Sequence, residues 1–365
     1  MLSIEKLIGI ASERDASDVH LIAGLPPKCR IDGRITDLYG EPLTPMDCEQ
    51  YGESLAGEEI KKIRETGQLD FAAAVAGRRL RVNLFRQQGR LSAALRLLRD
   101  GIPKLSELGL PPAAGLFSKW NKGIVLVTGE TGSGKSTTLA AILEEINATR
   151  PLHIITLEDP IEYVYTPKCA IVNQREVGAD VEDYETGLYA SLREDPDVIL
   201  VGEMRDLETI STAITAAETG HLVFSTLHTI GADKTIDRII DVFPPNQQQQ
   251  VRIQLASVLE CIVSQQLLKK ADGSGRVAAL EVLFANNAVR NLIRESKTYQ
   301  IPSIMQTNKR AGMQTMDDAL YDLFMRKVID ADTAVTYAQE PVGMNRKVNL
   351  DVGSGFDTGF NGQIF

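Results

Sequence analysis

The residues best suited to chemistry are in the stretch GETGSGKST at positions 129–137. This stretch fits the pattern GxxxxGK[ST]. It follows the apolar run GIVLVT and precedes a segment with helical spacing, which is the context that a phosphate-binding loop requires. Glycines let backbone N–H groups turn towards phosphates, and the N-terminus of the next helix adds a partial positive charge. The sequence therefore predicts a site for ATP or GTP.

The side chains of this loop predict how a nucleotide is held. Lys135 is expected to place a compact cation at the β- and γ-phosphates, and Ser136 to offer its hydroxyl to Mg²⁺. We therefore expect ATP and Mg²⁺ as cofactors. The residues expected to contact the nucleotide are Thr131, Gly132, Ser133, Gly134, Lys135, Ser136 and Thr137.

Two further apolar runs end in acidic residues. In IITLEDPIEY, Glu158 and Asp159 come at the carboxyl end of an expected strand, where ligands bind in open α/β sheets. In VILVGEMRD, Gly202 stands where an acid would usually follow the strand, and Glu203 comes one place later. The pattern predicts that both runs contribute to the phosphate site.

A third run, HLVFST, carries a histidine at each end. His221 stands at its start and His228 just past its end. Histidine can act as a neutral hydrogen-bond donor or become charged near neutral pH. We therefore expect both side chains to respond to the γ-phosphate.

The composition limits the classes of partner. Lys and Arg number 39 against 49 for Asp and Glu, a net charge of -10, which disfavours nucleic acid as a partner because phosphate contacts need a basic face. No apolar run reaches the roughly 20 residues that span a bilayer. The scattered cysteines favour reduced thiols in a cytoplasmic protein and argue against a zinc site; they are Cys29, Cys48, Cys169 and Cys261.

The chain has 365 residues, which is longer than a single hydrophobic core usually serves, so we expect two domains. Residues 1–100 read as a small α+β domain, and the Gly- and Pro-rich residues 101–112 as a linker. Residues 113–342 alternate buried strands and helices, as in a parallel sheet. The part beyond residue 246 is expected to be mostly helical, including QQQQVRIQLASVLECIVSQQLLKK. Residues 343–365 are interpreted as a disordered, Gly-rich tail without a helical pattern.

Four sequence boxes in order resemble the secretion ATPase superfamily of type II secretion and type IV pili. They are the phosphate loop, TLEDPIEY, VILVGEMRD and AETGHLVFSTLHT, followed by TIDRIIDVFP and SQQLL. Residues 288–320 further resemble the C-terminal signature of PilT-type retraction ATPases. The lack of a tetracysteine module and of a longer N-terminal region agrees with this group.

The resemblance implies a RecA-like P-loop ATPase domain preceded by a smaller, PAS-like α+β domain, in a homohexameric ring. It implies a motor for type IV pilus retraction and twitching motility. Such a motor is cytoplasmic, peripheral to the inner membrane rather than inserted, and acts on an inner-membrane platform protein. The alternatives are an ATPase of a related secretion or DNA-uptake system, and a slow nucleotide-binding switch or scaffold.

The resemblance also suggests roles for the acids and arginines. Glu158 and Glu203 are expected to share two tasks, aiming the attacking water and steadying Mg²⁺. We favour Glu158 on the water and Glu203 on the metal, with the reverse assignment left open, and Asp159 is a further metal candidate. A hexameric motor also needs positive charge from a neighbouring subunit. The candidates are Arg81 and Arg96 in the first domain and Arg193 and Arg238 in the second.

Overall fold

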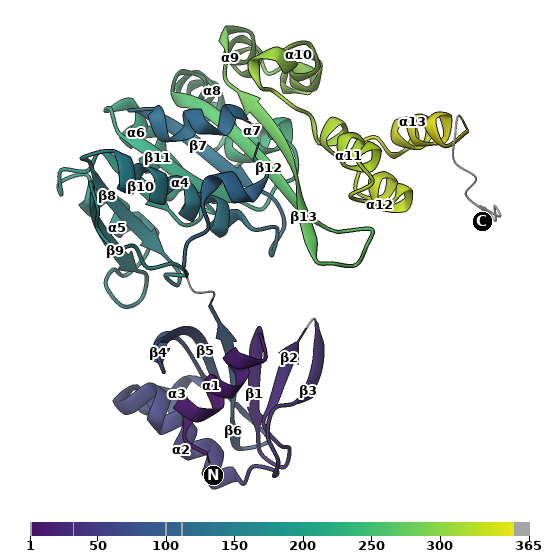
Figure 1. Ribbon diagram of the computed structural model, residues 1–365. Coiled ribbons are helices and arrows are strands. Elements are labelled where there is room, and N and C mark those ends of the chain that lie inside the picture. The colour runs from purple at the N-terminus through teal and green to yellow at the C-terminus, as the bar shows by residue number, and fades with distance from the viewer. Residues whose placement is uncertain (1, 32, 99–100, 111, 354–365) are drawn as a thin grey trace. The chain divides into compact units, whose positions relative to one another are not determined.

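The structure is a computed structural model that describes residues 2–31, 33–98, 101–110 and 112–353. The chain forms two compact units (Figure 1). Met1–Gly101 and Asp159–Val164 make up the first, and Ile102–Glu158 and Tyr165–Phe365 the second. The six residues from Asp159 to Val164 thus group with the first unit although they interrupt the sequence of the second. The sequence patterns did not indicate this interruption.

The first unit is an antiparallel sheet with helices, in the strand order β3-β2-β1-β6-β5-β4. Its strands are β1 Asp18–Ile22, β2 Lys28–Ile31, β3 Arg34–Asp37, β4 Gln68–Val75, β5 Arg78–Gln87 and β6 Arg90–Leu97. Its helices are α1 Ile4–Glu13, α2 Pro45–Ala56, η1 Gly57–Lys62 and α3 Ile63–Thr66. Leu80, Val82 and Leu84 alternate along β5 and share a buried core with Leu7 and Ile8 of α1. The predicted α+β class of this part is confirmed.

The second unit contains a seven-stranded sheet in the order β13-β12-β7-β11-β10-β8-β9. All neighbouring strands run parallel except β13, which is antiparallel to β12. The strands are β7 Gly123–Thr128, β8 His153–Glu158, β9 Ile171–Glu176, β10 Val198–Val201, β11 Leu222–Leu227, β12 Leu259–Lys269 and β13 Arg276–Phe284. In β7, β10 and β11 every residue is buried, as a parallel sheet covered on both faces requires.

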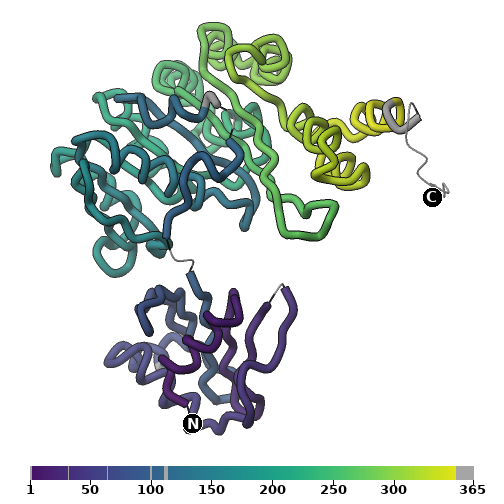
Figure 2. The backbone as a smooth tube through the Cα atoms, in the orientation of Figure 1, coloured from purple at the N-terminus to yellow at the C-terminus, as the bar shows by residue number. Residues whose placement is uncertain are grey.

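Helices follow most strands of this sheet, as the sequence predicted. They are α4 Lys135–Thr149, α5 Tyr184–Ser191, α6 Leu207–Glu218, α7 Ala232–Asp241, α8 Pro245–Val258, α9 Asn287–Arg294, α10 Ile301–Thr307, α11 Met316–Met325, α12 Ala331–Thr336 and α13 Pro341–Gly353. The short 3₁₀ helices are η2 Leu105–Leu108, η3 Pro112–Lys119, η4 Thr298–Gln300 and η5 Lys309–Ala311. The β12–β13 hairpin appears as the long green part of the tube in Figure 2.

The structure corrects two expectations about the second half of the chain. The segment after residue 246 is helical to Val258, but LECIVSQQLLK then forms β12 beside β7, and helices return only from α9 onward. Both faces of β12 are buried, so its sequence has no alternation, and periodicity alone does not separate such a strand from a buried helix. The expected tail is also wrong for residues 343–353, which belong to α13. Met344 and Val348, one turn apart, are buried in a core shared with α11. Residues 354–365 lie outside the described residues.

Candidate active site

The predicted phosphate loop lies between β7 and α4, with Gly134 as the residue before the helix. Three of its glycines have positive φ angles, 140° at Gly129, 83° at Gly132 and 92° at Gly134. A Cβ on Gly129 would lie 2.2 Å from the carbonyl oxygen of Gln265, and one on Gly134 would lie 2.8 Å from the Gln265 side-chain nitrogen. Both the backbone angles and the close approach of β12 therefore require glycine here.

Lys135 begins α4 and is buried. Its Nζ donates to the carbonyl oxygens of Gly129 at 2.8 Å and Glu130 at 3.1 Å, and lies 3.5 Å from Nδ1 of His228. The ammonium is thus held against the curled loop. The neighbouring Ser136 is exposed in the first turn of the helix, as are Thr131 and Gly132 in the loop. The lysine and the exposed loop residues together form a cationic cradle suited to a polyphosphate.

Glu203 follows β10 after Gly202 and takes part in a small charged cluster. Its Oε2 lies 2.7 Å from Arg205 Nη2, and its Oε1 lies 3.2 Å from His228 Nε2. Burial alone would raise the pKa of Glu203, but the Arg205 guanidinium and the His228 imidazole hold that pKa below its ordinary value. Glu203 is therefore an ionised carboxylate at neutral pH, which suits a group that binds a cation better than one that accepts a proton.

Gly202 has a steric reason for standing in front of Glu203. A Cβ at this position would lie 2.8 Å from the Tyr184 hydroxyl and 3.1 Å from the Leu157 carbonyl oxygen. The backbone of Gly202 donates to that carbonyl at 2.8 Å, and its own oxygen accepts from Thr226 at 2.7 Å. The acid is displaced by one residue because β8 and α5 leave no room for a side chain at the end of β10.

Glu158 is the last residue of β8, and the preceding residue, Leu157, pairs with Val201 of β10. Glu158 therefore lies at the same carboxyl edge of the sheet as Gly202 and Glu203. Its Oε1 accepts hydrogen bonds from Thr156 Oγ1 at 2.7 Å and Gln174 Nε2 at 3.1 Å. These two donors fix the direction of the carboxylate.

The two histidines are not brought together. His228 reaches the loop, with Nδ1 3.5 Å from Thr131 Oγ1 as well as from Lys135. His221 precedes β11, its carbonyl accepts from the first residue of β7, and its ring lies 2.8 Å from the Ala216 carbonyl. Six residues of β11, about 20 Å at the rise of a strand, separate this position from the phosphate loop. His221 therefore lies at the opposite edge of the sheet from the phosphate loop of its own chain, and its expected response to the γ-phosphate stays a prediction.

The remaining candidates in the second half of the sequence lie on several different elements. Arg193 precedes β10 at the amino edge of the sheet and lies over the Tyr189 ring, 4.8 Å from its centre. Arg238 is exposed on α7. Asp159 is exposed, directly follows Glu158 and groups with the first unit.

Arg81 and Arg96 face each other across β5 and β6 in the first unit. Both are exposed, and Arg96 Nε also donates to Asp18 Oδ1 at 3.0 Å. Like charges directly opposite on neighbouring strands are destabilising. The Asp18 carboxylate offsets part of this repulsion, and both guanidinium groups stay exposed.

Sequence reasoning missed Gln265 on β12. This side chain is buried, and its Nε2 donates to the Ser133 carbonyl at 2.6 Å while its Oε1 accepts from Thr138 Oγ1 at 2.8 Å. It thereby joins the phosphate loop to the first turn of α4. The polar pair in SQQLL, inside an apolar run, was the signal that could have found it.

Replacing Gln265 with Leu should weaken nucleotide binding by about 10-fold, because an unsatisfied buried polar group costs about 1–3 kcal/mol and the loop would lose its anchor. Isothermal titration with ADP measures the change. Gln266→Leu is the matched control, because Gln266 is equally buried but donates to Tyr337 instead. Equal affinities for both variants would contradict the anchoring role.

A strand, a glycine-rich loop with a buried lysine, and two acids at the carboxyl edge of a parallel sheet define a P-loop nucleotide hydrolase. The family described as Type II/IV secretion system protein matches residues 78–316. A Type IV pilus retractation ATPase, PilT, from Pseudomonas aeruginosa is 45% identical over 342 residues, covering 93% of this chain and 99% of that protein. This chain belongs to the type II/IV secretion system family and is an ATPase.

Two further relatives support this assignment over nearly the whole chain. A twitching motility protein from Neisseria gonorrhoeae is 45% identical over 348 residues, covering 94% of this chain and 92% of that protein. The crystal structure of the pilus retraction motor PilT with bound ADP is similar with a TM-score of 0.89 and 50% identity, covering 95% of this chain and all of that one. The RecA-like fold with an N-terminal domain is thereby confirmed.

Proposed function

We propose that this chain is a motor ATPase that powers the retraction of type IV pili. The observation that carries the proposal is the likeness over the full length of a pilus retraction motor, in a chain whose phosphate loop is complete. We further propose that it acts as a homohexamer at the inner face of the cytoplasmic membrane, on a platform protein. In the part of the chain that the structure describes, no helix has the length and apolar character to cross a bilayer.

The site suggests how ATP is held and Mg²⁺ is bound. Lys135 offsets the charge of the β- and γ-phosphates from its place against the loop. Among the described residues, no three His, Cys, Asp or Glu side chains gather to hold a metal by themselves. Mg²⁺ is commonly held by one or two protein oxygens with phosphates and waters. The Ser136 hydroxyl and the ionised Glu203 are such donors, and the ion would supply charge neutralisation.

The remaining polar groups divide the handling of water and phosphate. Glu158, with its carboxylate oriented by Thr156 and Gln174, is proposed to aim the attacking water. His228 lies within 3.5 Å of Lys135 and Thr131, and 3.2 Å from Glu203. It is therefore placed to respond when a γ-phosphate occupies the loop.

Positive charge from a neighbouring subunit completes the proposed mechanism. Arg81 and Arg96 are the favoured donors, because they form an exposed cationic pair. Arg193 and Arg238 are exposed on the second unit and remain further candidates for the same task. His221, placed at the opposite edge from its own phosphate loop, is not assigned a role.

Deleting the gene in a piliated strain should abolish twitching and leave surplus, non-retracting pili on the cell surface, because assembly continues without disassembly. Electron microscopy of surface pili and a twitching-zone assay measure the two effects, with the wild-type gene supplied in trans as the control. Loss of pili would instead indicate an assembly or secretion ATPase.

A further inference from the structure

A buried glutamate outside the phosphate site joins three separate parts of the second unit. Glu281 lies on β13 and is only 3% exposed. Its Oε1 accepts from the Ala232 N–H at 2.6 Å, and its Oε2 accepts from the Met316 N–H at 3.2 Å and from Gln339 Nε2 at 2.9 Å. The three donors belong to α7, α11 and the segment between α12 and α13.

Two of these donors are the first residues of helices, Ala232 of α7 and Met316 of α11. The first N–H groups of a helix have no partner within the helix and carry partial positive charge. Burial raises the pKa of Glu281, although the hydrogen bonds from Ala232 and Met316 act against the rise. All three donors are uncharged groups. The partial positive charge at the two helix N-termini therefore stabilises this buried carboxylate.

The α7 end of this link leads directly to the nucleotide site. Residues 228–231 connect β11 to α7, and His228 at their start contacts Lys135 and Glu203. At the other end of this loop the Gly231 N–H donates to Ser264 Oγ at 3.0 Å. Ser264 pairs with Glu281 across β12 and β13 and precedes Gln265, which anchors the phosphate loop.

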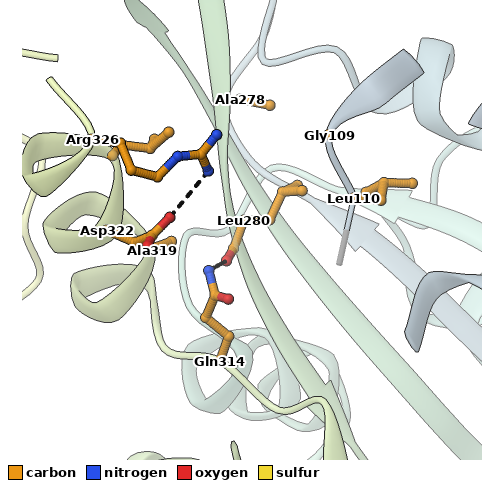
Figure 3. Close-up of a pocket in the computed structure, with 9 residues that line it drawn as sticks. Gly109, Leu110, Ala278, Leu280, Gln314, Ala319, Asp322 and Arg326 are labelled. Carbon is orange, nitrogen blue, oxygen red and sulfur yellow. Dashed lines mark hydrogen bonds and ion pairs between the residues drawn. The ribbon is translucent and has the colours of Figure 1, made fainter. Parts of the chain in front are cut away.

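The α11 end of the link packs on the sheet through Met316 and Leu320, both fully buried, and open space lies further along the helix. A cavity of about 330 Å³ lies beside β13 and α11, lined by Leu280 and Gln314 and by Asp322 and Arg326. Figure 3 shows these side chains around the space, with Gln314 bonded to the Leu280 carbonyl and Asp322 paired with Arg326.

We propose that Glu281 is a positioning residue that couples the phosphate-sensing loop, residues 228–231, to helices α11 and α13. A shift of His228 on nucleotide binding moves the start of α7, and Glu281 passes this shift to Met316 and Gln339. The proposal rests on nucleotide binding at the phosphate loop and does not depend on pilus retraction.

Hydrogen exchange of the full chain, with and without ADP and Mg²⁺, tests this coupling. In the unmodified protein, ADP should change the exchange rates of the amides at positions 316–320 by at least about 5-fold, the lower end of typical allosteric coupling. In Glu281→Gln this ADP-dependent ratio should fall below about 2-fold while ADP still binds. The amide NH₂ that replaces one carboxylate oxygen cannot accept a hydrogen bond, so the side chain no longer accepts from both α7 and α11. If Glu281 only caps the two helices, Glu281→Gln should change the exchange rates equally with and without ADP, and the ADP-dependent ratio should stay the same. That result would contradict the coupling.

Gln339→Ala provides an independent variant that does not touch the start of α7. It removes one donor to Glu281 but keeps the backbone bond from Gln339 N to Asp317 at 2.7 Å, and it decides the question if Glu281→Gln does not fold. Its ADP-dependent ratio for the amides at positions 342–346 of α13 should fall, whereas the exposed neighbour Glu340→Gln should keep the ratio of the unmodified protein there. An unchanged ratio at these α13 amides in Gln339→Ala, or no ADP effect in the unmodified protein, overturns the coupling. Failure of the unmodified protein to bind ADP would contradict the nucleotide site itself.

Discussion

Replacing Lys135 with Gln should lower ATP turnover by about 10²–10³-fold, the loss typical when one charge-stabilising donor is removed. The ammonium is buried and held against the loop by the carbonyls of Gly129 and Glu130, so the variant loses a positive charge that is fixed at the loop. Phosphate release at saturating ATP and Mg²⁺ measures the effect.

Lys122→Gln is the matched control for this change. Lys122 is exposed just before β7, so its replacement removes the same charge from the same region of sequence. Its turnover should equal that of the unmodified protein. If both variants lose activity equally, the effect would be one of net charge, and the role of Lys135 in phosphate binding would be contradicted.

The second large effect concerns the two glutamates at the carboxyl edge of the sheet. Glu158→Gln should lower turnover by about 10²–10⁴-fold, the range for a lost general base. It should leave the Mg²⁺-dependent affinity for ADP intact. Glu203→Gln should lower both, since Glu203 is an ionised carboxylate suited to the metal and is the ion-pair partner of His228.

Turnover and ADP affinity, each with Mg²⁺ and with EDTA, separate the two roles. Glu208→Gln, an exposed acid in the first turn of α6, serves as the control and should change neither quantity. If Glu203→Gln keeps the metal-dependent affinity and loses turnover, while Glu158→Gln loses both, the assignment of water and metal is reversed.

The sequence predicted the phosphate loop because all its determinants are local. Lys135 and the glycines lie within nine consecutive residues, between a strand and a helix that periodicity identifies. The same reasoning found Glu158, Glu203 and His228 at the carboxyl edge. It also grouped His221 with His228, although a histidine before a strand and one after it lie at opposite edges of the sheet.

The buried residues that support the site, Gln265 and Glu281, could not be predicted from local sequence patterns. Gln265 bonds to Thr138 across 127 residues of sequence, and Glu281 bonds to Ala232 across 49. Both lie on β12 or β13, and β12 had been interpreted as helix. A strand buried on both faces lacks the alternation that would have exposed the error. Long-range polar contacts within such a strand become visible only once the strands are paired.

The grouping of Asp159–Val164 with the first unit has a consequence for any attempt to divide this protein. The backbone passes from one unit to the other three times, after Gly101, after Glu158 and after Val164. A chain truncated to begin at Ile102 would keep the middle segment but lose the rest of the unit to which it belongs. Because Glu158 is bonded directly to Asp159, such a truncation would disturb an acid at the carboxyl edge of the sheet. Inactivity of the truncated chain would therefore not show that the first unit supplies catalytic groups.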